Sequence, residues 1–418
     1  MPAARIAVLG TFDVDNYGDH LFPRVARHEF GRRLPDAVVT PFAPYGALHP
    51  TGLDDGRPAE SLGPWAPERA RRLAADHHLV LVGGGELMHL NDPLLAPVYG
   101  ASPEELVRLA PSRWFVEGLG PDLEDDCPVV WHAVGVPWAP AEEGAARLRG
   151  ALGPRPYVTV RDRHSAERLV AAGVERPVDV VPDTALLIDR IMPAASLRAR
   201  LDRLRAAGGY PPSGSPALVV QGCDLLLPHL EGVAAAIEGW LSAQRVPPEI
   251  LALETGRCRG DTEFADRLAR ALGSRRVWRL PDARSVEDIA AAVAGGELFL
   301  GSSLHGAITA LVYGRPFVLL HLFGDAKLDG FGDLTGLERL VVHHPGDIPK
   351  GMRSAAEPVP VGLMPSLQAR IDVHFDRLAD LAAERAAARA DGGLSPARRT
   401  LLPAAARRLY GRLRRPLR

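Results

Sequence analysis

A histidine and a lysine, each directly after a predicted strand, have the clearest chemical potential in this chain. His305 lies in SSLHG, after the predicted strand 298–300, and Lys327 follows the next predicted strand, 316–321. In open α/β sheets, the loops at the carboxyl ends of the strands line the ligand site. An imidazole can carry a proton near neutral pH, and an ammonium group can hold an anion. The pair therefore predicts a site for a small anionic substrate, although an isolated histidine is often structural.

Two glycine-containing loops in the first half of the chain have comparable positions. Asn16 and Asp19 lie in GTFDVDNYGDHLF, which follows the first predicted strand and opens a helix, a place that favours anions. Their side chains can hydrogen-bond to sugar hydroxyls, and Asp19 can also act as a base or simply cap the helix. Gly84 and Gly85, in LVLVGGGELMH, follow a buried strand. Their turn is either structural or directs main-chain amides to a phosphate.

Arg161 and Asp183 end two further predicted strands. An arginine at a strand end can hold a carboxylate or phosphate through two parallel hydrogen bonds. The competing interpretation is an ion pair with Asp162 or Asp183. We expect Asp183 to orient either Arg161 or His305.

The elements that must position these residues are predicted by short β-branched runs that alternate with helical stretches. This pattern is typical of an α/β fold with βαβ units and largely parallel sheets. We expect two Rossmann-like domains that face a cleft, over 1–190 and 216–363, with a Gly/Pro/Ser-rich linker at 191–215. Apolar residues at helical spacing predict a helix over 364–390, and a basic tail, 391–418, follows it.

Composition excludes several classes of protein. The chain has 418 residues, is 46% hydrophobic and 24% charged, and has no run of the roughly 18 apolar residues that span a bilayer. Its start shows no signal-peptide pattern, so we expect a cytoplasmic protein. Three widely spaced cysteines without a CxxC pair predict buried thiols, with no disulfide frame and no metal site: Cys127, Cys223 and Cys258.

The charge is unevenly distributed. The net charge is −2, but residues 397–418 hold eight arginines and no acid, so the rest of the chain carries −2 − 8 = −10. An acidic body argues against nucleic acid as a partner. The tail is predicted to form a basic amphipathic helix in peripheral contact with anionic lipid at the inner membrane face. The alternatives are a solubilising tail and a helix docked on the acidic body.

Together, these segments resemble the polysaccharide pyruvyl transferase family over roughly residues 5 to 350. The resemblance rests on the NxGD loop, the GGG turn, the VRD segment, the SxLHG segment with the GxP after it, and Lys327. It implies a metal-independent enzyme with a fold similar to two-domain (GT-B-like) glycosyltransferases and without a cofactor. The implied reaction moves the enolpyruvyl group of phosphoenolpyruvate onto two hydroxyls of a glycan or lipid-linked saccharide, which forms a pyruvate ketal.

The resemblance also implies roles for individual residues. His305 is expected to act as general acid, and Asp19 or His305 itself as the base. The residues expected to bind substrate are Arg161, Lys327, Ser303, Asn16, Gly84, Gly85 and Asp183. Ser303 is a departure, because the family usually has there an arginine that binds phosphoenolpyruvate. Two alternatives stay open: a nucleotide-sugar glycosyltransferase on the same scaffold, and a non-catalytic glycan-binding paralogue.

Overall fold

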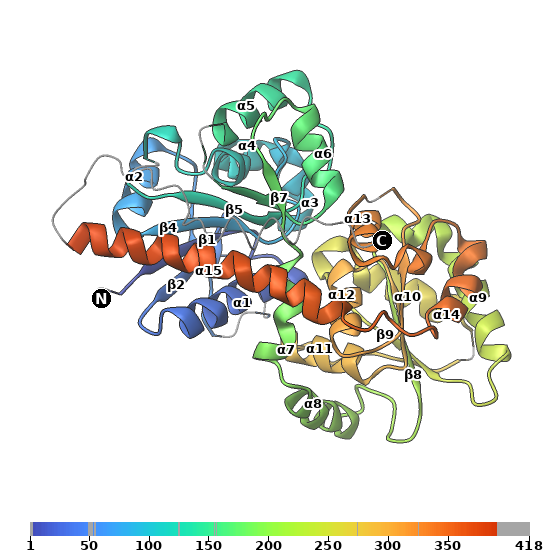
Figure 1. Ribbon diagram of the computed structural model, residues 1–418. Helices are drawn as coiled ribbons and strands as arrows, with labels where there is room; N and C mark the ends of the chain where they lie inside the picture. Colours follow the sequence, from blue (N-terminus) through green and yellow to red (C-terminus); the bar gives the residue numbers. More distant parts are fainter. Residues whose placement is uncertain are drawn as a thin grey trace.

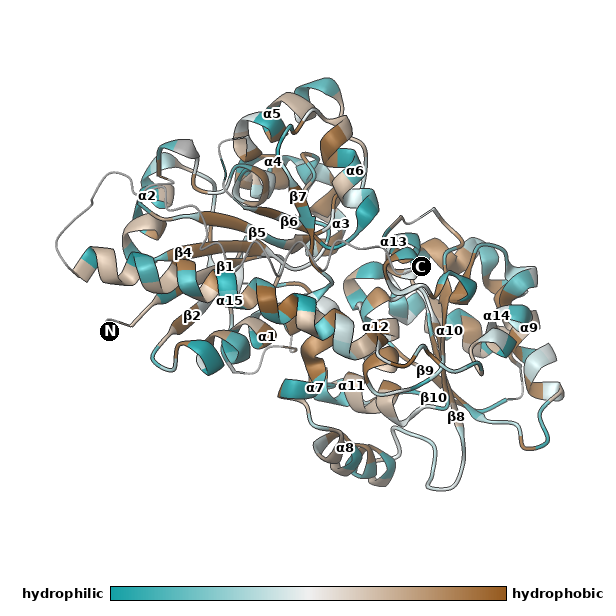
Figure 2. Cartoon of the chain, in the orientation of Figure 1, coloured by the Kyte–Doolittle hydropathy of each residue, from teal (hydrophilic) through white to brown (hydrophobic). Residues whose placement is uncertain are grey.

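The computed structural model describes residues 3–48, 53, 56–123, 126–153, 155, 157–273, 275–324 and 326–390. Within these residues the chain forms two α/β units, each built around one parallel sheet (Figure 1). Hydrophobic residues concentrate on the strands, and hydrophilic ones on the outer faces of the helices (Figure 2). The tail 391–418 and its predicted amphipathic helix lie outside the described residues. Among the described helices, none is long and apolar enough to cross a membrane.

The first unit contains a seven-stranded sheet in the order β3-β2-β1-β4-β5-β6-β7. Its strands are β1 (Arg5–Leu9), β2 (Val38–Ala43), β3 (Glu60–Ser61), β4 (Leu79–Gly83), β5 (Val129–Val134), β6 (Val158–Val160) and β7 (Val178–Val180). The main helices between them are α1 (Tyr17–Arg33), α2 (Pro67–Asp76), α4 (Pro103–Leu109), α5 (Glu142–Leu152) and α6 (Arg163–Ala171). The central strands β4 and β5 are buried along their whole length, as expected where helices cover both faces of a parallel sheet.

The second unit contains a six-stranded sheet in the order β10-β9-β8-β11-β12-β13. Its strands are β8 (Ala217–Gln221), β9 (Glu249–Ala252), β10 (Val277–Trp278), β11 (Leu298–Gly301), β12 (Phe317–Leu320) and β13 (Val341–Val342). Its main helices are α9 (Leu230–Ser242), α10 (Asp261–Ala271), α11 (Val286–Gly295), α12 (Leu304–Val312), α13 (Ala326–Thr335) and α14 (Ile348–Ser354). In both sheets the strand order reverses once, between β1 and β4 and between β8 and β11. Such reversals are where ligands bind in open α/β sheets.

The range 191–215, which we expected to be a linker, is largely a packed helix. Helix α8 (Ala194–Ala206) lies in it and packs along α11. Leu197, Leu201 and Leu204 are buried, and their spacing puts them on one helical face. The Gly/Pro/Ser composition after the helix is a real signal for a loop, but it concealed this amphipathic pattern.

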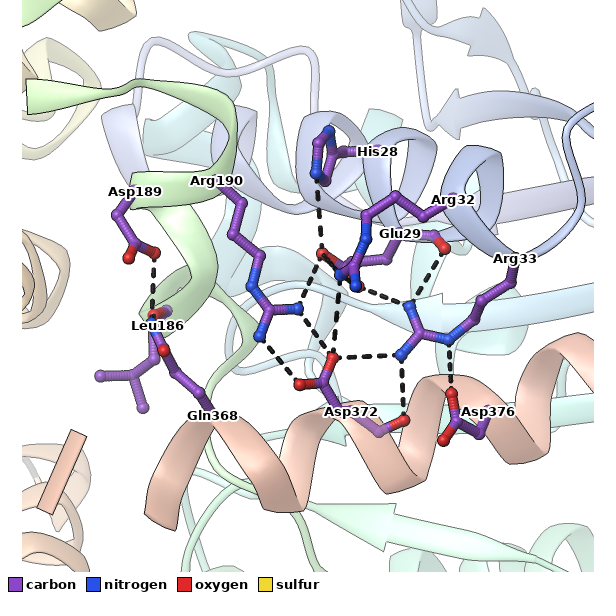
Figure 3. A network of polar contacts seen from close by, with 10 residues as sticks. All are labelled: His28, Glu29, Arg32, Arg33, Leu186, Asp189, Arg190, Gln368, Asp372 and Asp376. Atoms are coloured by element: carbon purple, nitrogen blue, oxygen red, sulfur yellow. Dashed lines mark hydrogen bonds and ion pairs between the residues drawn. The ribbon is translucent and has the colours of Figure 1, made fainter. Parts of the chain in front are cut away.

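The last described helix, α15 (Leu363–Ala390), returns to the first unit and runs along it (Figure 1). It packs against β1, β4 and α1. Figure 3 shows the ion pairs that hold its outer side, around Glu29 of α1, whose side chain is fully buried. Arg33 lies 2.5 Å and Arg190 3.1 Å from the Glu29 carboxylate, and both arginines also pair with Asp372 of α15. Because two arginines share these acids, α1, the segment before α8 and α15 are fixed to one another.

A buried polar chain holds the inner side of α15. His374 Nε2 lies 2.7 Å from His132 Nδ1 on β5, and His374 Nδ1 lies 2.7 Å from the hydroxyl of Tyr157. Burial lowers the pKa of His132 to about 4 and brings the pKa of His374 well below its usual value. Both imidazoles are therefore neutral, and they act as hydrogen-bonding groups of the core.

Candidate active site

Seven ionisable side chains meet where the carboxyl ends of the two sheets face each other. Four come from the first unit and follow β1, β4, β6 and β7, and three come from the second and follow β9, β11 and β12. We call them the interdomain cluster: Asp19, Glu86, Arg161, Asp183, Arg259, His305 and Lys327. The loops after β1, β4 and β11 adjoin the two points where strand order reverses, so the topology itself places the cluster.

His305, on the first turn of α12, reaches into the first unit. Its Nε2 lies 3.4 Å from Oδ2 of Asp183, and its ring meets Phe22 edge-on at 5.4 Å between centroids. Burial alone would raise the pKa of Asp183, but His305, Arg161 and the amide of Ala185 together lower it. Asp183 is thus held as an anion beside the imidazole of His305.

A close contact with His305 explains why the NxGD loop has a glycine at position 18. A Cβ atom built on Gly18 would lie only 1.9 Å from Nδ1 of His305. The helix backbone therefore contacts the imidazole directly, and no side chain fits between them. This contact joins residues that are far apart in the sequence, and it limits the ring near Nδ1, whereas Asp183 lies near Nε2.

Asp19 is buried on the first turn of α1, but it does not cap the helix. The N-cap is Asn16, whose side chain accepts a hydrogen bond from the amide of Gly18 at 3.4 Å. Burial raises the pKa of Asp19 to about 6, although His305, Arg259 and Asn16 act in the opposite direction. Since its pKa lies near neutral pH, Asp19 has the property that a general base needs. A Cβ atom built on Gly256 of the second unit would lie 3.7 Å from Oδ1 of Asn16, so this side chain stands where the two units meet.

Arg161 is more deeply enclosed than we expected of a residue that holds a substrate. It is 4% exposed, and its guanidinium lies 3.4 Å from Glu86, 3.5 Å from Asp162 and 4.0 Å from Asp183. The ion pairs that we regarded as the competing interpretation are therefore present. Arg161 lies behind Glu86 and Asp183, where its charge holds the two carboxylates in place.

Lys327 and Arg259 supply the more accessible positive charges. Lys327 Nζ donates a hydrogen bond to Oε2 of Glu86 at 3.3 Å. Arg259 is an exposed residue that follows β9, and in the described part of the chain no carboxylate lies within 4 Å of its guanidinium. Burial alone would raise the pKa of Glu86, yet Lys327, Arg161 and Arg259 lower it to about 2. Arg259 thus faces the cluster without an ion-pair partner among the described residues.

Ser303 is the N-cap of α12. Its hydroxyl accepts a hydrogen bond from the amide of Gly306 at 3.2 Å, and its own amide donates to Oε1 of Gln221 at 2.8 Å. A serine at this position therefore has a local role, since it begins the helix that carries His305. It brings no charge to the cluster.

The glycine turn after β4 has a backbone that other residues rarely adopt. Gly84 has φ +102° and Gly85 φ +93°. A Cβ on Gly85 would stand 3.2 Å from Oδ1 of Asp19. The turn therefore lets the main chain approach Asp19 closely, and a larger residue would be both strained and crowded there.

The sequence reading missed the roles of Arg259 and Glu86. Arg259 lies in LETGRCRGD, directly after a predicted strand, so the strand-end rule that selected His305 also applied to it. Glu86 follows the GGG turn, and the sequence predicted no role for it. Its partner Lys327 is 241 residues away, so only the fold brings the two together.

The fold and site place the protein in the class of two-domain, GT-B-like enzymes, and comparison with known structures confirms this fold. The UDP-N-acetylglucosamine 2-epimerase from Rickettsia bellii superposes with TM-score 0.55 at 12% identity, over 93% of this chain and 98% of the epimerase. The corresponding enzyme from Methanocaldococcus jannaschii gives TM-score 0.53 at 11% identity, over 88% and 99%. The wall teichoic acid polymerase TagF gives 0.50 at 11% identity, over 94% and 90%. At these identities the likeness shows the fold alone.

Comparison with family profiles is more specific than the structural comparison. The profile of the polysaccharide pyruvyl transferase family matches residues 16–320, which is most of the chain and contains Asp19, Arg161, Asp183 and His305. The chain belongs to this family, as the motifs predicted. The match implies a transferase that acts on polysaccharides. No curated protein matches the chain in sequence.

Proposed function

We propose that this protein transfers the enolpyruvyl group of phosphoenolpyruvate to two hydroxyls of a glycan and forms a cyclic pyruvate ketal. The observation that carries the proposal is the pairing of His305 with Asp183 beside a group of cations from both units. An enol ether that carries a carboxylate and a phosphate needs both a proton donor and positive charge.

The reaction follows from the positions of the residues. Imidazolium at His305 gives its proton to the methylene carbon, which creates a cationic centre at the adjacent carbon. A sugar hydroxyl attacks this centre while Asp19 takes its proton, and a second hydroxyl then displaces inorganic phosphate. Asp19 passes the proton of the first hydroxyl to the departing phosphate, and the proton of the second hydroxyl returns to His305, so both residues regain their starting states. Asp183 holds His305 in place, since one of its carboxylate oxygens lies 3.4 Å from Nε2 of the imidazole.

The donor is held by Lys327 and Arg259 in this proposal, with Arg161 behind them. Arg259 is the better candidate for direct contact, because a guanidinium can bind a carboxylate or phosphate with two parallel hydrogen bonds. It supplies from the loop after β9 the arginine that Ser303 does not supply from α12. The change at Ser303 is thus compatible with a trianionic donor.

Calorimetric titration with phosphoenolpyruvate tests this proposal. Arg259→Gln should weaken binding by about 10- to 100-fold, since a hydrogen bond to a charged group contributes about 1.5–3 kcal/mol. The matched control is Arg257→Gln, two residues earlier, because Arg257 is committed to Glu254 at 2.7 Å and to Asp282. His305→Gln should keep most of the binding but reduce phosphate release on the acceptor by at least about 100-fold.

Several results would count against the proposal. Equal weakening by Arg257→Gln and Arg259→Gln would assign the donor to a different surface. Saturable binding of a UDP-sugar without binding of phosphoenolpyruvate would favour the nucleotide-sugar glycosyltransferase. Full turnover in His305→Gln would remove the general acid.

A further inference from the structure

A second group of ligating side chains lies at the ends of β12 and β13 and on α13. His321 follows β12, Asp329 lies in α13 and His343 follows β13. His321 Nδ1 is 3.0 Å and His343 Nε2 is 2.8 Å from the same carboxylate oxygen, Oδ1 of Asp329. One ligand atom from each residue lies within 4.8 Å of the others. Three elements that are separate in the sequence thus point three metal-binding groups at one spot.

The burial of these residues suits a bound ion that solvent can reach. The side chain of His321 is 7% exposed, and its Nε2 is buried with no hydrogen-bond partner among the described residues. The hydrogen-bonding capacity of this ring is therefore only partly used inside the protein. His343 and Asp329 are 59% and 36% exposed, so an ion can enter from that side and a water can complete its coordination.

The donor atoms select the kind of ion. Two imidazoles and one carboxylate suit Zn²⁺ and similar transition metals, whereas Ca²⁺ and Mg²⁺ prefer sets of oxygen atoms. At Zn–N and Zn–O distances of about 2.0–2.2 Å, tetrahedral ligand atoms lie about 3.4 Å apart. The two contacts to Asp329, at 3.0 and 2.8 Å, are shorter than this spacing, so these ligand atoms would move apart by about 0.5 Å to admit the ion. All three ligand atoms lie within 4.8 Å of one another.

We propose that His321, Asp329 and His343 form a Zn²⁺ site with an open fourth position for water. The ion would join the ends of β12 and β13 to α13. Asp329 lies two residues after Lys327, so the site would also hold the segment that presents Lys327 to Glu86. The site lies beyond the residues that the family profile matches, and it does not depend on the proposed reaction.

Metal binding by the full chain tests this site directly. Chelator-treated protein is titrated with Zn²⁺ by calorimetry and with Co²⁺ by visible absorption, because tetrahedral Co²⁺ absorbs strongly. We expect one tight equivalent, weakened at least about tenfold in His343→Asn and in Asp329→Asn, since changes even behind a metal ligand cost about 10- to 100-fold. The matched control is His344→Asn, an exposed neighbour that caps a short helix, where asparagine keeps the cap.

The controls make the outcome decisive. Circular dichroism and unfolding of each variant show whether it is folded, and the Co²⁺ spectrum of the unmodified protein needs no variant. Absence of a stoichiometric site in the unmodified protein would show that Asp329 only accepts hydrogen bonds from two histidines. Equal affinity in His343→Asn, or equal loss in His344→Asn, would also overturn the assignment. Phosphoenolpyruvate binding is measured separately, so failure of one proposal does not conceal the other.

Discussion

Replacing Gly18 with alanine is the sharpest test of how the two units hold His305. The new methyl group would start 1.9 Å from Nδ1 of His305 and 2.5 Å from two ring carbons. Carbon and nitrogen atoms in contact need about 3.5 Å, so the ring or the helix must move by about 1.5 Å. Phe22 and Asp183 leave the imidazole little room to retreat.

The size of the effect can be judged against a control in the same helix. Gly31, also in α1, has open space around its Cβ position. Both substitutions gain helix propensity, by about 0.5–1 kcal/mol in a helix interior, so this gain largely cancels in the comparison. What remains is overpacking, which costs about 1–3 kcal/mol. We therefore expect Gly18→Ala to unfold more easily than Gly31→Ala by that amount.

Two assays check this expectation. Urea unfolding gives the stability difference, and phosphate release from phosphoenolpyruvate on the acceptor gives the activity. A displacement of about 1 Å at a reacting group can cost about 100-fold in rate, so turnover should fall by at least that factor in Gly18→Ala only. If Gly18→Ala matches Gly31→Ala in both assays, the imidazole is not held against α1, and the geometry of the cluster is wrong.

Three further predictions concern charge. Burial raises the pKa of Asp19 to about 6, so its carboxylate forms as the pH rises and kcat/KM should increase between about pH 5 and pH 7. Asp19→Asn should abolish this increase of kcat/KM with pH. Burial lowers the pKa of His132 to about 4 and that of His374 well below its usual value, whereas an unfolded histidine binds a proton near pH 6.5. The free energy of unfolding should therefore fall as the pH drops below 6.5, by about 3 kcal/mol at low pH for His132 alone. Urea unfolding at several pH values measures this change. Glu29→Gln should cost about 3 kcal/mol in chemical unfolding because it leaves arginines under-compensated, whereas Asp376→Asn, at an exposed pair, should cost under about 1 kcal/mol.

The sequence predicted the sheets well because their strands are buried on both faces. The ranges expected for β11 and β12, 298–300 and 316–321, agree with the structure to within one residue at each end, since each strand is a short buried run dominated by apolar residues. Edge strands were harder. Strand β3 has two exposed residues and no pattern at all, so nothing in the sequence marks it. Helix α8, within the range 191–215 that we expected to be a linker, was missed for another reason. The loop-forming composition after it concealed its amphipathic pattern.

The sequence predicted the site through one local rule, which is that residues in loops after parallel strands line the ligand site. Strand-end position selected His305, Asp183 and Lys327, and the structure brings all three into the interdomain cluster. The rule cannot tell which strand-end residues point at a substrate and which are held by ion pairs, so it left both interpretations open for Arg161, which is buried and ion-paired. The strand-end rule applied equally to Arg259, but only the fold shows that this arginine faces the interdomain cluster.

The return of α15 to the first unit has a consequence for synthesis of the chain. His132 on β5 and Tyr157, directly before β6, leave the ribosome early, but their partner His374 belongs to the last described helix. Domains usually fold in the order in which they are made. Here the second unit can complete its folding before the first unit, because one face of the first unit stays exposed until residues 363–390 have been made. A chain cut short before Leu363 would therefore damage the half of the molecule that was made first.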